Sequence, residues 1–187
     1  MICIINCGTS YLEEIKNNVE ELGYSYEIVD LENINKTNFQ SFSGIIITGA
    51  PTLLTQINQQ EYLKPFEFIK TINLPLLGIC LGHQIIGLLY GAEIQRGKLI
   101  NKLEKIEIIT KETLFSNIKN QSQFKEEHSE FINLPEDFHA LAISKSCKNE
   151  AMKHKIKPIF GVQFHPEVSN NNGKIVLRNF LSLCKKI

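Results

Sequence analysis

The sequence predicts an α/β fold. Over the first half of the chain, short apolar runs typical of buried strands alternate with amphipathic helical patterns. Strands that alternate with helices form parallel sheets covered by helices on both faces. From about residue 92 onward, β-rich runs follow one another with few helical patterns between them. We therefore expect an open, flavodoxin-like parallel sheet with helices on both faces and a small antiparallel β extension.

The first strand and helix are clearly marked. Residues 1–6 (MICIIN) form an apolar run, which predicts a buried strand. A helix is expected over residues 10–23, with a capping box from Ser10 and Glu13 at its start and Gly23 at its end. The apolar residues spaced to form one face of this helix are Leu12, Ile15, Val19 and Leu22.

The next elements continue the alternation. Strands are expected at residues 24–30, 43–51 and 74–80, and helices at 59–72 and 82–91. Pro65 should kink the helix at 59–72 or start a new one, because proline cannot continue the hydrogen bonds of a helix interior. Gly91 closes the helix at 82–91.

The second half is richer in strands. Separate strands are expected at residues 92–95, 102–109, 138–144, 150–155 and 158–164, and an amphipathic helix at 173–187. We expect His128 in a solvated loop, with a pocket or an interface as the alternative position, and His139 and His154 on the surface. No linker, repeat or low-complexity tract interrupts the chain, so residues 1–187 are expected to form one domain.

Composition limits the function classes. The chain has 187 residues, and its 20 basic and 20 acidic side chains cancel, which disfavours a nucleic-acid or anionic membrane partner. The five cysteines are odd in number and show no CxxC spacing, so neither a disulfide framework nor a metal site is expected. The N-terminal residues lack the basic leader of a secretory signal, and we expect a cytoplasmic protein.

One cysteine stands in an unusual frame. Residues 78–84 read GICLGHQ, which places Cys80 between Gly78 and Gly82 at a predicted strand-to-helix junction. Glycines two positions before and after a nucleophile allow the sharp turn of a nucleophile elbow. The start of the following helix favours a thiolate and an oxyanion. Buried cysteine is common as packing, but this frame favours a nucleophile.

A base and its orienting group stand near the other end of the sequence. Residues 161–168 read GVQFHPEV, with His165 after an apolar strand and Glu167 two positions later. In an extended chain these two side chains point to the same side, so the carboxylate can reach the imidazole. A thiol nucleophile needs such an oriented base. We therefore predict a triad of Cys80, His165 and Glu167.

The two motifs together resemble those of the class I, triad-type glutamine amidotransferases, and the likeness spans essentially the whole chain. In that family a cysteine attacks the side-chain amide of glutamine, which gives a γ-glutamyl thioester and ammonia, and water then releases glutamate. The resemblance implies that Cys80 is the nucleophile, His165 the general base and acid, and Glu167 the residue that orients His165.

The resemblance also implies the oxyanion and substrate contacts. The N–H of Leu81 is expected to be one oxyanion donor, and the loop TGAP (residues 48–51), with Gly49 and Ala50, supplies the second. Gln84 matches a position that contacts glutamine. Ser129 and its neighbours hold the α-amino and α-carboxyl groups of the substrate. Ala50 stands where relatives usually have glycine, and a left-handed backbone there would cost alanine roughly 1–2 kcal/mol.

Within the family, several details resemble the glutaminase subunit of two-subunit GMP synthases: Val168 after the HPE motif, the block at residues 142–154, and LRNFLSLC at 177–184. This implies a separate ATP-pyrophosphatase partner that converts XMP to GMP. No phosphate-binding loop motif occurs in this chain. No cofactor is therefore expected here, and ATP and Mg²⁺ are expected on the partner subunit.

Three alternatives stay open at this point. The chain could serve as the glutaminase of another synthase, or act as a free-standing γ-glutamyl hydrolase. It could also be a catalytically silent module that regulates a synthase. Partner identity separates the first two from the leading interpretation, whereas an intact triad argues against the third.

Overall fold

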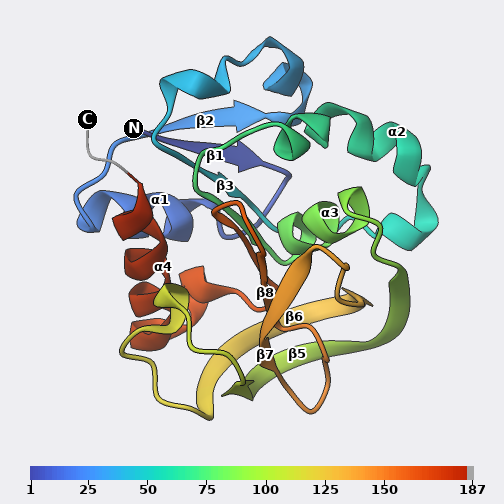
Figure 1. Ribbon diagram of the computed structural model, residues 1–187, viewed down its shortest axis with the longest axis vertical. Helices are drawn as coiled ribbons and strands as arrows, with labels where there is room; N and C mark the ends of the chain where they lie inside the picture. Colours follow the sequence, from blue (N-terminus) through green and yellow to red (C-terminus); the bar gives the residue numbers. More distant parts are fainter. Residues whose placement is uncertain (185–187) are drawn as a thin grey trace.

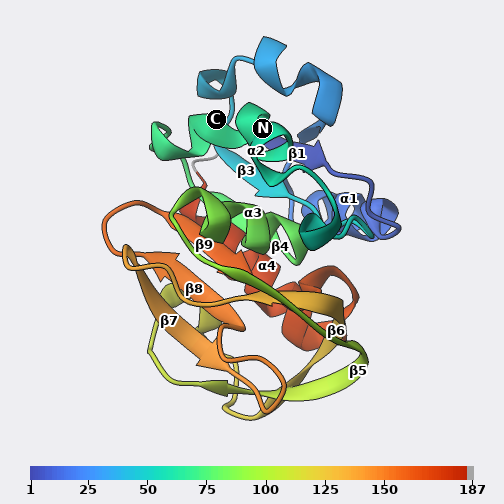
Figure 2. The ribbon, with the colours of Figure 1, turned by 90° about the vertical axis from the view of Figure 1, so that its right-hand side faces the viewer.

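A single mixed sheet organises the computed structural model, which describes residues 1–184. Within these residues nine strands follow the order β2-β1-β3-β4-β9-β8-β7-β5-β6. The strands are β1 (Ile2–Asn6), β2 (Tyr26–Asp30), β3 (Gly44–Ile47), β4 (Leu76–Ile79), β5 (Ile94–Ile108), β6 (Ser122–Ile132), β7 (Phe138–Ile143), β8 (Ala151–His154) and β9 (Ile159–Val162). The strands from β2 to β9 in this order are parallel, and the remaining neighbours pair antiparallel. The predicted parallel sheet with an antiparallel extension is confirmed (Figures 1 and 2).

Helices cover both faces of the parallel part (Figure 1). Helices α1 (Leu12–Glu21) and α4 (Asn170–Leu183) pack on one face, and α3 (Leu81–Leu89) packs on the other with the 3₁₀ helix η4 (Lys64–Lys70). Successive side chains of β1 enter opposite clusters, with Ile4 on the α1 side. Its neighbour Ile5 is buried on the α3 side. This two-sided burial explains why the parallel strands read as continuous apolar runs.

The helix boundaries follow the predicted stops more closely than the predicted starts. Gly23 and Gly91 both adopt positive φ after a helix, as expected for glycine at a helix C-terminus. Helix α2 (Gln59–Leu63) ends just before Pro65, and η4 begins there.

The start of α1 differs from the prediction. The prediction of a capping box from Ser10 and Glu13 is wrong, because no side chain caps α1. The Tyr11 N–H instead donates to Thr9 Oγ1 at 3.1 Å. The final helix begins at Asn170, and the predicted residues 185–187 lie outside the described part.

The strands of the antiparallel extension differ most from the predicted ones. The strands predicted at 92–95 and 102–109 are parts of one long strand, β5, whose register with β6 shifts between Arg96 and Ile100. Strand β6 was not predicted, and it places His128 in the sheet at 5% exposure, so the expectation of a solvated loop is wrong. His154 is also buried, against the rings of Tyr90 and Phe138.

The reason for missing β6 is physical. Its residues alternate strictly between buried and half-exposed over most of its length, as a strand with one buried face should. Three of the buried side chains, however, are Glu126, His128 and Glu130. A pattern search for alternating apolar residues cannot detect a strand whose inward face is polar.

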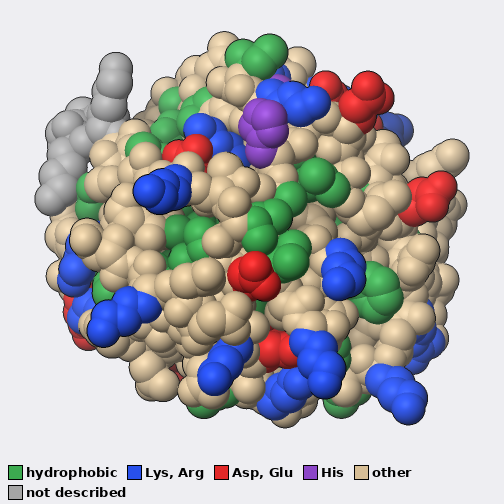
Figure 3. Space-filling model, turned by 60° about the horizontal axis from the view of Figure 1, so that its bottom comes forward, with side chains coloured by type: hydrophobic (Ala, Val, Ile, Leu, Met, Phe, Trp, Pro, Cys, Tyr) green, Lys and Arg blue, Asp and Glu red, His purple; other side chains and the backbone are tan. Residues whose placement is uncertain are grey.

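The molecular surface carries mixed charge. Figure 3 shows one face, on which lysine and arginine side chains lie singly or in small groups, with acidic and apolar side chains among them. None of the helices in residues 1–184 combines the length and the apolar character that a membrane-spanning helix requires.

Candidate active site

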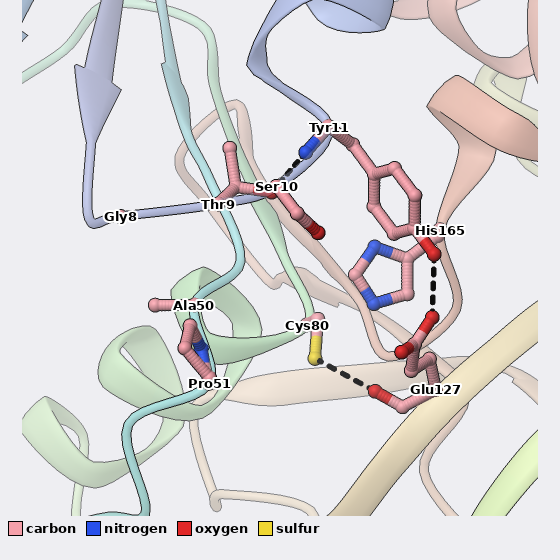
Figure 4. Close-up of a pocket in the computed structure, with 9 residues that line it drawn as sticks. All are labelled: Gly8, Thr9, Ser10, Tyr11, Ala50, Pro51, Cys80, Glu127 and His165. Carbon is pink, nitrogen blue, oxygen red and sulfur yellow. Dashed lines mark hydrogen bonds between the residues drawn. The ribbon is translucent and has the colours of Figure 1, made fainter.

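The predicted catalytic residues meet at the carboxyl ends of the parallel strands, where α/β sheets bind their ligands. Cys80 follows β4 and His165 follows β9, while the loops after β1 and β3 supply residues 8–11 and Ala50 with Pro51. Together with Glu127 of β6 they line a cavity of about 340 Å³ (Figure 4).

Cys80 occupies a strained turn between β4 and α3. Its φ of 50° and ψ of −102° lie in a region that non-glycine residues rarely adopt. A Cβ on Gly78 would lie 2.5 Å from the backbone of Gly82, and a Cβ on Gly82 would lie 2.4 Å from the carbonyl oxygen of Ile47. Only glycine fits at either position, so the predicted nucleophile-elbow geometry is present.

His165 is held on two sides. Its backbone N–H donates to the carbonyl of Lys125 at 2.8 Å, and its Nδ1 lies 2.7 Å from Glu167 Oε1. Both side chains are almost fully buried. The expected contact is therefore formed, but by a different route: Glu167 reaches back from the 3₁₀ helix η6 (Pro166–Val168) and not from an extended chain.

The electrostatics of His165 follow from these neighbours. Burial alone would lower the pKa of His165, but the adjacent Cys80 and Glu167 outweigh it and raise that pKa well above its usual range. The site therefore favours a positively charged imidazole beside the sulfur. Figure 4 shows the two side chains facing the same space.

The loop after β3 approaches both groups closely. A Cβ on Gly49 would lie 3.1 Å from His165 Cε1 and 3.4 Å from Cys80 Cβ, so glycine lets the backbone come near. Ala50 is not among the described residues with positive φ, so the strain considered for alanine there does not arise. Leu81 is the first residue of α3, and its N–H has no acceptor within the helix.

A second cavity of about 210 Å³ shares Cys80 with the first. It is lined by the predicted residues Gln84, Ser129 and Ala50, together with Leu99. Gln84 is buried and its Nε2 donates to the carbonyl of Glu130 at 2.8 Å. The predicted site residues that line one or both cavities are Cys80, His165, Ala50, Gln84 and Ser129, and Cys80 lines both.

Several residues of the site were not predicted. The Tyr11 hydroxyl donates to Glu127 Oε2 at 2.5 Å, and its ring packs edge-on against His165 with ring centroids 5.3 Å apart. This hydrogen bond to Glu127 raises the pKa of Tyr11 to about 12. The Glu130 carboxylate accepts the N–H groups of Leu54 at 2.7 Å and Thr55 at 3.0 Å, and so ties the loop after β3 to β6. These contacts join segments that are far apart in the sequence, so no local sequence pattern could have predicted them.

Ionisable groups also gather behind the second cavity. Glu126 of β6 faces Glu150, which precedes β8, and both are fully buried. Burial raises the pKa of Glu126 to about 7, and burial together with Glu126 raises the pKa of Glu150 well above its usual range. Glu126 Oε2 lies 3.2 Å from His128 Nε2, and His128 Nδ1 lies 3.1 Å from the carbonyl of Glu130. The carbonyl requires Nδ1 to carry the proton, so a protonated Glu126 can donate to Nε2.

The other cysteines differ from Cys80. All are buried, and burial raises the pKa of the Cys3, Cys7 and Cys184 thiols to about 12. Burial also raises the pKa of Cys147. These four thiols are packed inside the protein, and no disulfide or cluster of metal ligands occurs in residues 1–184.

Comparisons with known proteins match almost the whole chain. The family model for class-I glutamine amidotransferases matches residues 3–184. Two relatives are named as the A subunit of glutamine-hydrolysing GMP synthase. The protein from Pyrococcus abyssi is 37% identical over 194 residues and covers 100% of both chains. The protein from Methanocaldococcus jannaschii is 36% identical over 191 residues, with 98% of this chain and 97% of that one covered.

Solved structures show the same fold. A protein from Thermoplasma acidophilum, described as a candidate for the same GMP synthase component, superposes with a TM-score of 0.89 at 29% identity, covering 98% of this chain and 92% of that one. A glutamine amidotransferase from Thermotoga maritima reaches a TM-score of 0.80 at 18% identity, covering 97% and 96%, which shows the fold alone. The match over residues 3–184 and the identity to full-length relatives lead to one conclusion: this chain belongs to the class-I glutamine amidotransferase family.

Proposed function

We propose that this chain is the glutaminase subunit of a two-subunit GMP synthase. It hydrolyses glutamine to glutamate and ammonia, and a separate ATP-pyrophosphatase subunit uses the ammonia to convert XMP to GMP. The full-length relatives named as a component of GMP synthase support this assignment. One observation carries the chemistry: a thiol on a strained elbow faces an imidazole whose Nδ1 lies 2.7 Å from a buried carboxylate.

The first half of the reaction makes a thioester. His165 takes the proton of the Cys80 thiol, and the sulfur attacks the side-chain amide carbon of glutamine. His165 then gives its proton to the amide nitrogen, the C–N bond breaks, and ammonia leaves. Glu167 accepts the Nδ1–H of His165, which turns Nε2 toward the sulfur and stabilises the imidazolium.

The second half releases glutamate. His165 takes a proton from water, the hydroxide adds to the thioester carbon, and the C–S bond breaks to return the Cys80 sulfur. In both halves the negative oxygen is stabilised by the N–H of Leu81 and by the loop that carries Gly49 and Ala50. Gln84 and Ser129, which line the second cavity beside Cys80, bind the substrate.

Nucleotide chemistry belongs to the partner in this proposal. The partner subunit binds ATP, Mg²⁺ and XMP, and the chain described here supplies only ammonia. We place the complex in the cytoplasm, where the five reduced thiols are stable.

The test uses the chain together with its cognate synthetase subunit. Cys80→Ala should abolish GMP synthesis from glutamine and leave synthesis from added ammonium intact, because only ammonia production is lost. Cys147→Ala, which removes a buried thiol outside the site, is the matched control and should retain both activities. Glutamine-dependent synthesis by the Cys80→Ala complex would refute the assignment.

A second arm tests the partner. We expect low glutamine turnover by the isolated chain and a strong rise when the synthetase subunit, ATP, Mg²⁺ and XMP are all present. Glutamate release is measured with each component omitted in turn. Full turnover without a partner would favour a free-standing hydrolase, and activation only by a different synthase would replace the GMP assignment while keeping the Cys80 chemistry.

A further inference from the structure

Two buried side-chain amides lead to the Cys80 sulfur. Gln163 lies between β9 and His165 and is fully buried. Its Nε2 lies 3.6 Å from Cys80 Sγ, a distance suited to an N–H···S hydrogen bond. Its backbone N–H donates to the carbonyl of Glu150 at 2.8 Å, which fixes the residue at the carboxyl end of β9.

The neighbours of Gln163 determine which end of its amide faces the sulfur. Gln84 Nε2 donates to the carbonyl of Glu130 at 2.8 Å, and a carbonyl can only accept, so the nitrogen of Gln84 is identified. The same nitrogen lies 3.2 Å from Gln163 Oε1. With its oxygen engaged by a donor, Gln163 must present its N–H groups to Cys80.

We propose that Gln163 is a further catalytic residue, whose side-chain N–H binds the Cys80 sulfur and stabilises it as a thiolate. The inference rests on the proposed thioester chemistry at this sulfur. It assigns Gln84 a second task besides the predicted substrate contact, because Gln84 orients Gln163. Gln84 is thus a positioning residue for the nucleophile.

The two protonation states of Cys80 have different partners. The thiol can donate its proton to the carbonyl of Glu127, 3.8 Å away. Once the proton has moved to His165, the sulfur is an acceptor, and the N–H of Gln163 is directed at it. A hydrogen bond to the charged form favours that form.

The same contact serves both halves of the reaction. Before attack it increases the fraction of sulfur that is ionised. During hydrolysis the C–S bond breaks and the electron pair returns to sulfur, so a donor already in place stabilises the leaving thiolate. The donor requires no rearrangement, because both Gln163 and Gln84 are buried and hydrogen-bonded before substrate binds.

The experiment measures the ionisation of Cys80 without glutamine. The pH dependence of Cys80 alkylation by iodoacetamide is followed by peptide mass mapping, and the midpoint reports the Cys80–His165 pair. Gln163→Met keeps the side-chain length and removes the N–H donor. We expect its midpoint to rise by about one pH unit and its alkylation rate at low pH to fall about tenfold, while the rate at high pH is retained.

Two further variants make the result decisive. Gln163→Glu replaces the donor with an acceptor and should shift the midpoint in the same direction; it also tests the idea if Gln163→Met fails to fold. Gln123→Met, at an exposed position on β6, is the matched control and should titrate like the wild type. A folded Gln163→Met or Gln163→Glu chain with an unchanged midpoint overturns the proposal.

This readout separates two possible failures. Because iodoacetamide needs no glutamine site, a shifted midpoint in a chain that no synthase activates would support the Gln163 contact and refute the proposed function. Normal partner-dependent turnover with an unshifted midpoint would retain the function and refute the role of Gln163.

Discussion

The raised pKa of buried Glu126 can be tested by measuring how the unfolding free energy of the protein changes with pH. Burial raises its pKa from the ordinary value of 4.5 to about 7. The folded protein therefore binds this proton more tightly than the unfolded chain does. The resulting stabilisation is fully present below about pH 4.5 and is lost as the pH rises to about 7, with no further change above that value.

The magnitude follows from the two pKa values. Their difference is about 2.5 pH units, which corresponds to roughly 3 kcal/mol of unfolding free energy lost across the window. Glu126→Gln imitates the protonated acid, because its amide can still donate to His128 Nε2. We expect the variant to match the wild type near pH 4.5 and to be about 3 kcal/mol more stable above about pH 7.5.

The assay is urea unfolding of both proteins at a series of pH values, read as the difference between them. The titrations of groups that do not interact with Glu126 cancel in this difference, whereas that of Glu150, whose pKa Glu126 raises, contributes to it. Glu107→Gln, an exposed change on β5, serves as the control for the removal of a carboxylate. A difference between Glu126→Gln and the wild type that does not change with pH would refute the reasoning, because it would mean that the pKa of Glu126 is the same in the folded and the unfolded protein.

The remaining predictions concern turnover in the complex with the cognate synthetase. Glu167→Gln should lower the turnover number by about 10³-fold or more, because the orientation of His165 is lost, with little change in thermal stability; full turnover would reduce the triad to a dyad. Gly49→Ala should lower the turnover number by about tenfold to a hundredfold, because its new Cβ would lie 3.1 Å from His165 Cε1 and displace an oxyanion donor. Steady-state glutamate release measures both, and an unchanged rate in Gly49→Ala would remove this loop from the oxyanion site.

The parallel half of the fold was predictable because its signals are local. Each strand is a short apolar run, and helix stops carry their own glycine, as at Gly23 and Gly91. The proximity of Cys80 and His165 was predictable for the same reason. Residues that follow parallel strands lie together at the carboxyl ends of those strands. The geometry between Glu167 and His165 was predicted correctly, although the local backbone was not.

Strand β6 was not predictable in the same way. Its inward positions hold Glu126, His128 and Glu130, which read as solvent-exposed residues when the sequence stands alone. Their burial depends on partners from other elements, such as Glu150 before β8 and the N–H groups of Leu54 and Thr55. Polar residues at buried positions are expected where a fold serves function, and the local rules failed at such a place.

The two glycines that frame Cys80 have a consequence for how such sequences change over time. Each is required by packing, because any side chain at Gly78 or Gly82 would collide with backbone atoms of the neighbouring strand or helix. A descendant that had lost catalysis would still need both in order to fold. The two glycines therefore indicate how the sheet is built and not whether the protein is active. The pairing of His165 with Glu167 serves catalysis, so we expect it to be lost by substitution in a descendant that no longer catalyses the reaction.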